Sequence, residues 1–376
     1  EVGLVYQVWL RSIYCPALNL DATLDGVGNF TGLISSGQSY PFGYDPLYRL
    51  IDLSQGSSVL EHFDDDANGN RTAANLGGAA QSCAYPSTSH RLQSINGISR
   101  DYDNVGNTTR RDGLNYRYNG RNGLSQVSSG RTTFYAASYN ARGEREEKTV
   151  MAGMTTLRFL YDEAGRLIQT GNVPRIGLTR TLKPEQRLLW LDDQLVGVKI
   201  KATSGAYAGE LLYAHTDHLG TPRALSRPSN NSTVWRWPLE TSAFGQHPAQ
   251  TDPDGDGQAL TFNLRYPGQY FDSESGLHYN YFRDYEAGVG RYIESDPIGF
   301  EGGISTCAYV YSSSLIASDA VGLAAAYGLP GTNETAHNLG EGGVFVSLRR
   351  RVRTPLLEMK RVRHNCLAHI MGPKMR

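Results

Sequence analysis

Residues 265–303 read RYPGQYFDSESGLHYNYFRDYEAGVGRYIESDPIGFEGG, and the stretch continues as ISTCAYVYSSSLIASDAVGL to Leu323. It is dense in Tyr, Phe, Gly, Asp and Arg, and it lacks the spacing of an amphipathic helix. Two Asp-x-x-Gly blocks lie inside it, one starting at Asp296 and the other at Asp319. The stretch separates a repetitive N-terminal part from a C-terminal tail of different composition.

The composition favours a β protein. The chain has 376 residues, enough for a large core, with 42 Gly and 23 Tyr against 11 Phe. Tyr combines strand preference with a polar tip, and many glycines allow tight turns between strands. The formal net charge of −1 excludes a global attraction to nucleic acid or anionic lipid.

The cysteines and the termini bear on the type of protein. The four cysteines are Cys15, Cys83, Cys307 and Cys366. They are far apart and form no C-x-x-C pair, which argues against a disulfide scaffold or a zinc site. The sequence contains no signal-peptide pattern and no apolar run of transmembrane length. Because it begins at Glu1 without Met, we expect a fragment of a longer chain.

The first half carries an internal repeat with the phrase Asp-x-x-Gly-Asn/Arg, often degraded and often preceded by Tyr. Copies start at Asp25, Asp45, Asp66, Asp103, Asn119, Asn140 and Asp162, with a weaker copy, STSHRL, at Ser87. The first residue can bond its side chain to the backbone two residues on, and the Gly supplies positive φ. Each unit is therefore predicted to be a β-hairpin of about 20 residues, which must stack on its neighbours to be stable.

From Leu188 the repeat fades but hairpins continue. One is expected to turn at residues 192–194 and another at 217–220, and Trp235 and Trp237 alternate in a further strand. No helix-length amphipathic pattern interrupts residues 1–320. The predicted fold class is all-β.

These motifs resemble a known family. The Tyr-Asp repeats resemble the YD repeats of RHS proteins, and YAHTDHLGTPRAL followed by the 265–303 stretch resembles the RHS repeat-associated core domain. The resemblance covers about residues 20–323, and its core portion is the more specific because several motifs occur in the family's order. The family includes bacterial polymorphic toxins, the C component of insecticidal toxin complexes and, more distantly, the teneurins.

The resemblance implies an architecture and a function. It implies YD hairpins in a spiralling sheet that forms a shell, closed at one end by the core domain and followed by a short irregular or helical tail. The expected divisions are repeats at 1–187, core domain at 188–323 and variable tail at 324–376. The implied function is a secreted or surface-exposed bacterial shell that encloses its own C-terminal segment as cargo, with secretion-machinery and immunity proteins as partners. Because the chain begins within a repeat, the shell is expected to be incomplete.

The family's core domain is associated with aspartate-dependent self-cleavage after its closing D-P-x-G-L motif. By motif, the carboxylate pair falls on Asp296 and Asp319, and the family's arginine on Arg283 in YFRDY. The cut bond would join Leu323 to Ala324. Two close carboxylates can divide into one acid and one base, and a cation between them can stabilise an oxyanion. Position 320 is Ala where the motif has Pro, which is expected to loosen Asp319.

Other polar groups fit turn or strand-end roles better than a metal or nucleophile site. Asp252, Asp254 and Asp256 resemble the opening of a calcium loop, but Asn263 stands at the twelfth position, and Asp64, Asp66 and Asn68 show the same half-match with Asn75. His215 and His218 lack a third metal ligand, and Ser242 lies in no nucleophile motif. We therefore predict no metal and no cofactor.

The tail of residues 324–376 carries nine Lys or Arg and three Glu. Its basic residues are expected on short helices that are interrupted at Pro355. These residues are Arg349, Arg350, Arg351, Arg353, Lys360, Arg361 and Arg363. If nucleic acid is a partner, it is expected to bind only through these residues. The histidines His337, His364 and His369 show no recognisable nuclease spacing. Two further functions stay open: a surface adhesin that binds carbohydrate through Tyr and Trp ladders, and a nuclease effector that acts through the tail.

Overall fold

In the computed structural model the described residues are 10–15, 17–26, 28–174, 182–202, 204–205, 207–327, 337–339, 343–345 and 367–370. Two long antiparallel sheets account for most of them. The first has eleven strands in the order β10 to β1 followed by β32. Its strands are β1 (Leu10–Cys15), β2 (Leu18–Leu24), β3 (Phe30–Ser35), β4 (Gln38–Tyr44), β5 (Leu50–Gln55), β6 (Ser58–Asp65), β7 (Arg71–Leu76), β8 (Ala79–Ala84), β9 (Ser94–Ile95), β10 (Ile98–Ser99) and β32 (Leu367–Ile370).

The second sheet has thirteen strands that follow one another in sequence order. They are β11 (Asp101–Tyr102), β12 (Thr108–Arg111), β13 (Leu114–Tyr118), β14 (Leu124–Ser129), β15 (Thr132–Tyr139), β16 (Arg145–Val150), β17 (Thr155–Tyr161), β18 (Leu167–Asn172), β19 (Lys183–Leu191), β20 (Gln194–Ile200), β21 (Leu211–Thr216), β22 (Pro222–Ser226) and β23 (Thr233–Arg236).

A smaller sheet is built from the 265–323 stretch. It contains β24 (Tyr270–Asp272), β25 (Leu277–Asn280), β26 (Arg283–Glu286) and β27 (Arg291–Tyr292). Short pairs are formed by β28 (Ala317–Ser318) with β29 (Ala326–Tyr327) and by β30 (His337–Leu339) with β31 (Gly343–Phe345). The helical elements among the described residues are single 3-10 turns: η1 (Leu239–Thr241), η2 (Ala287–Val289), η3 (Gly299–Gly302) and η4 (Val310–Ser312).

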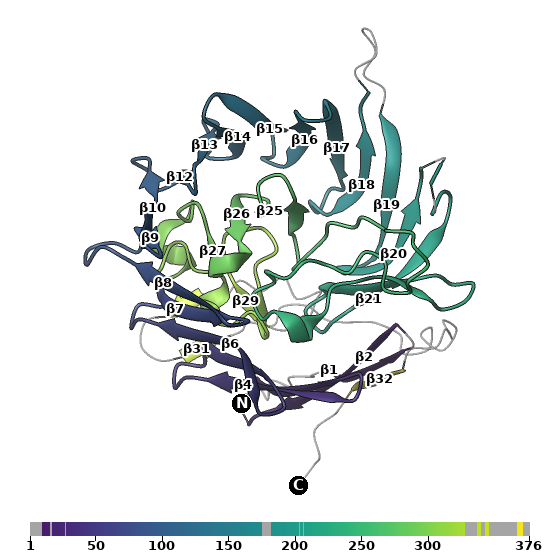
Figure 1. Cartoon of the computed structure of the whole chain (residues 1–376), viewed down its shortest axis with the longest axis horizontal. Coiled ribbons are helices and arrows are strands. Elements are labelled where there is room, and N and C mark those ends of the chain that lie inside the picture. The colour runs from purple at the N-terminus through teal and green to yellow at the C-terminus, as the bar shows by residue number, and fades with distance from the viewer. Residues whose placement is uncertain are drawn as a thin grey trace, which may run out of the picture.

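The two long sheets curve around the small one. The two long sheets together form a strip of strands. Figure 1 shows this strip, from β2 to β21, bending around β25, β26 and β27 of the small sheet, which is therefore called the central sheet. The all-β prediction and the spiralling strip of hairpins are therefore confirmed. In the tail the described segments are short strands, and the basic residues expected on helices lie outside the described residues.

The Asp-x-x-Gly blocks form one recurring turn. In the copy at Asp103, the Asp103 N–H donates to Asn107 O (3.0 Å), and the amides of Gly106 and Asn107 donate to Asp103 Oδ1 (both 2.9 Å). Asn107 Nδ2 donates to the second carboxylate oxygen (2.9 Å), which explains the preference for Asn or Arg at the fifth position. The Asp217 turn has the same pattern, with Thr221 N donating to Asp217 Oδ1 (3.0 Å). The hairpin predicted at 217–220 is thus confirmed.

The structure explains why a Tyr often precedes the Asp-x-x-Gly block. The strand register shifts at this Tyr, for example between Ser138 and Tyr139, and such bulges redirect a side chain. The hydroxyl of Tyr139 donates to Leu124 O (2.7 Å), and that of Tyr118 donates to Thr108 O (2.7 Å). Tyr118 and Tyr139 therefore tie their own hairpins to the preceding ones, whereas the buried hydroxyl of Tyr44 has no such bond.

The weak copy at Ser87 departs from the others. It lies in a longer loop between β8 and β9, where Ser89 N donates to Pro86 O (3.2 Å) without the Asp side-chain bonds. The strip divides soon afterwards, between β10 and β11. Arg100 stands at this division and pairs with Glu286 of the small sheet, with Nη1 2.6 Å from Oε2.

The core lies between the strip and the central sheet. One apolar cluster joins repeat residues such as Leu50 and Phe63 to Phe244 and Leu315. Another joins Val127 and Tyr135 to Leu277 and Ile293. These clusters therefore bind the two layers together. The largest cluster contains Trp235, Trp237, Tyr285, Tyr292 and Tyr309.

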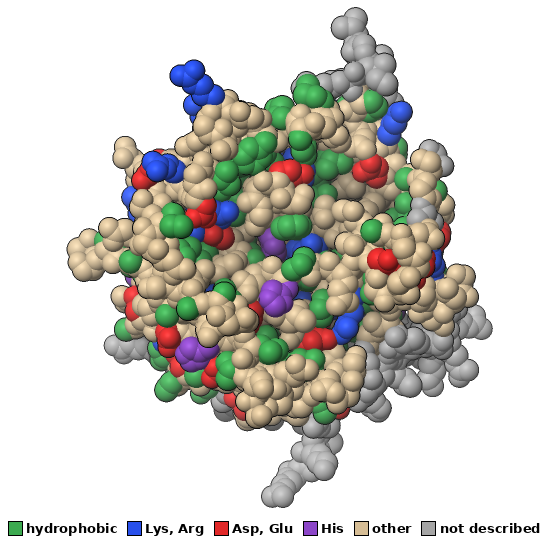
Figure 2. Space-filling model, in the orientation of Figure 1, with side chains coloured by type: hydrophobic (Ala, Val, Ile, Leu, Met, Phe, Trp, Pro, Cys, Tyr) green, Lys and Arg blue, Asp and Glu red, His purple; other side chains and the backbone are tan. Residues whose placement is uncertain are grey.

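Ion pairs reinforce the same junction. Arg145 and Lys148 of β16 both contact Asp272 of β24, and these three side chains are at most 2 % exposed. On the outside, basic and acidic side chains are interspersed over the face shown in Figure 2, in keeping with the small net charge. None of the described helices is long and apolar enough to cross a membrane.

Candidate functional site

Three separate segments meet at the site. Arg283 opens β26, Asp296 follows β27, and Asp319 follows β28. All three side chains are 3 % exposed. The fold therefore brings together the three residues that the motifs single out.

A single guanidinium nitrogen joins the two carboxylates. Arg283 Nη2 lies 3.0 Å from Asp296 Oδ2 and 3.1 Å from Asp319 Oδ2. The other nitrogens of Arg283 donate to main-chain carbonyls, Nε to Gly322 O and Nη1 to Thr306 O (3.2 Å). The arginine thus holds the carboxylate pair and the loop that contains the expected cut.

Asp319 is tightly held even though residue 320 is Ala. The amides of Gly322 (2.8 Å) and Leu323 (3.0 Å) donate to Asp319 Oδ1, and the hydroxyl of Tyr292 donates to Oδ2 (2.8 Å). The loop is also pressed against the core, because a Cβ on Gly268 would lie 1.8 Å from Ala320 O. None of these bonds uses a group that proline at position 320 would supply.

Asp296 lies beside the expected cleavage bond. A Cβ on Gly302 would stand 2.3 Å from Asp296 Oδ2 and 2.9 Å from the main-chain oxygen of Leu323. Because Gly302 has no side chain, the carboxyl and this carbonyl can share the space. Asp296 Oδ1 accepts from the amide of Ile298 (3.0 Å), which directs Oδ2 toward Arg283 and Leu323.

The two carboxyls differ in environment. Burial raises the pKa of Asp296 to about 6, Arg283 opposes the rise, and the Asp319 carboxylate adds to it. Asp319 instead receives four hydrogen bonds or ion-pair contacts from donors. Donors to the charged form of a carboxyl favour that form. At near-neutral pH, Asp296 is therefore the member of the pair that can hold a proton.

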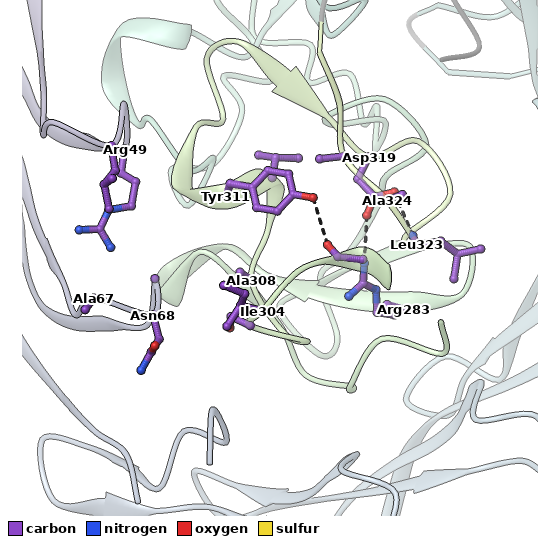
Figure 3. A pocket seen from close by; sticks show the side chains of 16 residues that line it. Arg49, Ala67, Asn68, Arg283, Ile304, Ala308, Tyr311, Asp319, Leu323 and Ala324 are labelled. Atoms are coloured by element: carbon purple, nitrogen blue, oxygen red, sulfur yellow. Dashed lines mark hydrogen bonds and ion pairs between the residues drawn. The ribbon is translucent and has the colours of Figure 1, made fainter. Parts of the chain in front are cut away.

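A cavity of about 220 Å³ opens at the site. Its walls include Arg283, Asp319, Leu323 and Ala324 on one side, as Figure 3 shows, and turn residues of the repeats on the other. The turn residues Arg49, Ala67 and Asn68 face the site across this space. A cavity with several polar groups on its walls has room for water.

The remaining candidate residues have structural roles. Asp66 caps its turn by accepting from the amides of Asn68 (2.8 Å) and Asn70 (2.9 Å). His218 is stacked on Phe30 and lies 2.7 Å from Leu315 O, whereas His215 lies 2.8 Å from Ser226 Oγ.

The acidic loop and Ser242 also have hydrogen-bond or ion-pair partners. Asp252, Asp254 and Asp256 approach one another within 4.8 Å. Arg227 is paired with Asp254 and Asp256, and Asp252 accepts from two amides of its own loop. Ser242 Oγ accepts from the amide of Gln246 (3.0 Å). Cys83 and Cys307 are free thiols and are buried.

Sequence reasoning missed three residues of the site. Tyr292 and Asn280 contact Asp319 directly, and Gly302 provides the space for Asp296. Tyr292 was only one of many tyrosines, and Asn280 lies in the run GLHYN without a distinctive spacing. The one available signal was the GRYIESDPIGFEGG run, which contains Tyr292 and Gly302 on either side of Asp296.

Comparisons with known proteins connect this arrangement to a family. No family model matches the chain. It is 30 % identical over 354 residues to the double-stranded DNA deaminase toxin A of Burkholderia cenocepacia, covering 86 % of this chain and 23 % of that protein. It is 28 % identical over 311 residues to the probable deoxyribonuclease RhsA of Dickeya dadantii, covering 80 % and 20 %.

A solved structure shows the same fold. The Photorhabdus luminescens Tc holotoxin pore matches with a TM-score of 0.64 and 17 % identity, over 81 % of this chain and 17 % of that one. The chain spans less than a quarter of the length of these relatives. With its YD hairpins, its central RHS-type sheet and these likenesses, the chain belongs to the RHS/YD-repeat protein family.

Proposed function

We propose that this chain is part of the encapsulating β shell of an RHS-type polymorphic toxin, and that its core domain cuts the chain between Leu323 and Ala324. Residues 1–187 would form the repeats, 188–323 the core domain and 324–376 the cargo end. The observation that carries the cleavage is the placement of the Leu323 carbonyl beside the carboxyl of Asp296. The relatives are toxins or probable deoxyribonucleases by name, which supports a C-terminal effector as cargo.

The chemistry divides between the two carboxyls. Asp319, held as a carboxylate by Arg283, Tyr292 and two amides, accepts a proton from a water molecule in the cavity. The water oxygen attacks the carbonyl carbon of Leu323, while protonated Asp296 donates to the carbonyl oxygen. Collapse of the tetrahedral intermediate returns a hydroxyl proton to Asp296 and breaks the bond to the Ala324 nitrogen. The nitrogen takes the proton that Asp319 accepted from water, and a carboxyl group is left on Leu323. Arg283 balances the charge that passes between the carboxyls.

A carbohydrate-binding adhesin receives less support from the aromatic residues. Trp235 and Trp237 are at most 2 % exposed, and the tyrosines of the largest cluster are buried with them. Stacked sugars need exposed ring faces. A nuclease acting through the tail depends on residues outside the described part of the chain.

The partners and the location are part of the same proposal. We infer a secreted or surface-exposed bacterial protein whose partners are its own C-terminal segment, a secretion apparatus and an immunity protein. Nucleic acid would be reached only through the tail.

Synthesis of the whole chain in a cell-free system, followed by intact-mass spectrometry, tests the cleavage. We expect two products whose masses correspond to residues 1–323 and 324–376, and only the full-length chain for Asp296→Asn and Asp319→Asn. The control Asp101→Asn makes the same chemical change on β11. It should leave the cut unchanged, since Asp101 lies far from the site in the chain and is largely exposed. An uncut wild-type chain would refute self-cleavage.

A further inference from the structure

We propose that Tyr292, oriented by Asn280, is a positioning residue that keeps Asp319 as the ionised member of the carboxylate pair. This inference rests on the proposed self-cleavage and gives roles to two residues besides Asp296, Asp319 and Arg283. The Tyr292 hydroxyl donates to Asp319 Oδ2 (2.8 Å), and Asn280 Nδ2 lies 2.7 Å from the Tyr292 oxygen.

The direction of the hydrogen bonds follows from a third contact. Asn280 Nδ2 also donates to the main-chain oxygen of Asp319 (2.8 Å), and a carbonyl oxygen can only accept. This contact requires the amide nitrogen on the side that faces Tyr292, so Asn280 donates to the tyrosine oxygen. The phenolic proton is then directed to Asp319 Oδ2, which must be the acceptor. Asn280, Tyr292 and Asp319 thus form a chain of donors that ends on the carboxylate.

The tyrosine also supports the cation. The guanidinium carbon of Arg283 lies 3.7 Å from the centre of the Tyr292 ring, so the ring faces the group that joins both carboxyls. Burial and then the adjacent Asp319 carboxylate raise the pKa of Tyr292 well above its usual value. The hydroxyl therefore stays protonated and remains a donor. Asp296 for its part accepts from the amide of Ile298 and pairs with Arg283.

The groups that face Asp319 come from every segment packed around it. They are Arg283 from β26, Tyr292 from β27, Asp296 from the following loop, and Tyr309 and Tyr311 around η4. Of these groups, Asp296 alone changes charge near neutral pH, with a pKa of about 6. A change of the cleavage rate near neutral pH therefore reports on Asp296.

Replacement Tyr292→Phe tests the proposal because it keeps the ring and removes only the hydroxyl. We expect cleavage to slow by about 10- to 100-fold, the effect of losing a hydrogen bond to a charged group. We also expect the acid side of the pH–rate profile to move to higher pH, since the carboxylate of Asp319 loses a donor. Asn280→Ala should move the profile in the same direction.

The matched control is Tyr285→Phe. Tyr285 pairs with Tyr292 across β26 and β27, is equally buried, and donates its hydroxyl to Phe244 O (2.9 Å), away from the carboxyls. It should lose similar stability and keep the wild-type pH profile. A Tyr292→Phe chain that cuts at the wild-type rate and with the wild-type profile would overturn the proposal.

A second measurement does not depend on cleavage. In the Asp296→Asn chain, a double-mutant cycle of Tyr292→Phe and Asp319→Asn on urea unfolding should show that the two effects are not additive. If the wild type never cuts, the proposed self-cleavage is wrong. The cycle still tests whether the hydrogen bond from Tyr292 acts on Asp319. Additive effects would show that Tyr292 does not act on Asp319.

Discussion

The carboxyl group of Asp296 and the main-chain carbonyl of Leu323 both border the point where a side chain on Gly302 would begin. A Cβ there would lie 2.3 Å from Asp296 Oδ2 and 2.9 Å from Leu323 O. Neither distance is compatible with an ordinary carbon contact. The absence of a side chain at this position therefore permits the approach of the acid to the bond.

We predict that Gly302→Ala slows self-cleavage by at least about 10-fold, which corresponds to about 1.4 kcal/mol in the barrier. The methyl group must displace the Asp296 carboxyl or the Leu323 carbonyl, and either movement separates them. The measurement is the fraction cut over time after cell-free synthesis. Gly288→Ala is the control, since the atom nearest to its added Cβ would be 4.0 Å away. Equal rates for the two alanine chains would show that the approach is not needed.

The pH dependence follows from the raised pKa of Asp296. Because its pKa is about 6, its protonated form is present below that pH and disappears above it. If Asp296 donates a proton to Leu323, cleavage should be fastest below about pH 6 and slow about tenfold for each further pH unit above it. A pulse of labelled synthesis followed by incubation at a series of pH values would measure this. A rate that rises through pH 6 would instead make Asp296 the base.

Stability should respond in the same pH range. The folded-state pKa of Asp296 lies above the value of an unfolded Asp, so its contribution to stability is complete at low pH and is lost as pH rises through about 6. Asp296→Asn removes the titrating group, so the urea midpoint of this chain should depend less on pH between about pH 4 and pH 6 than that of the uncut Asp319→Asn chain, in which burial still acts on Asp296.

Arg283 should not be replaceable by lysine. The guanidinium reaches both carboxyls and two main-chain carbonyls, whereas an ammonium group has one charged centre and cannot match that fork. We predict that Arg283→Lys abolishes cleavage and lowers the free energy of unfolding by about 2–4 kcal/mol.

The control for that change is Arg223→Lys. Arg223 is equally buried and pairs with Asp217 (2.8 Å), outside the carboxylate pair. It should destabilise the chain to a similar degree and leave the cut intact. Loss of cleavage in both lysine chains would mean that the cut reports only on folding.

The repeat turns could be read from the sequence because their bonds are local. In Asp103 and Asp162 the side chain binds amides only two to four residues away, so a five-residue phrase contains the whole interaction. The family motifs likewise led to Asp296, Asp319 and Arg283, which the fold brings together.

The rest of the site depends on contacts between distant segments. Asn280 and Tyr292 resemble ordinary core residues until β25, β27 and the 319–323 loop come together. The bonds that hold Asp319 likewise come from residues on other segments as well as from its own loop, so the motif at 319–323 alone does not show them. The break between β10 and β11 had only a weak trace in the sequence, the degraded copy at Ser87.

The junction between the strip and the central sheet yields the last prediction. Asp272 of β24 accepts from Arg145 and from Lys148 (2.9 Å), and all three side chains are almost fully buried. Burial raises the pKa of Asp272, but the two cations more than reverse this, so it lies below the usual value. Asp272→Asn would leave two buried cations without their shared anion, and we expect a loss of about 3–5 kcal/mol in the free energy of unfolding.

Urea unfolding and hydrogen exchange in β16 would measure the loss. Because the folded-state pKa is lowered, the contribution of Asp272 is present above the unfolded pKa and disappears as pH falls through the folded one, so the difference between the two chains should shrink in acid. Asp101→Asn removes a largely exposed partner of Arg110 and should cost less than about 1 kcal/mol. If Asp272→Asn unfolds at the wild-type urea concentration, the ion pairs of Asp272 do not contribute to holding the strip and the central sheet together.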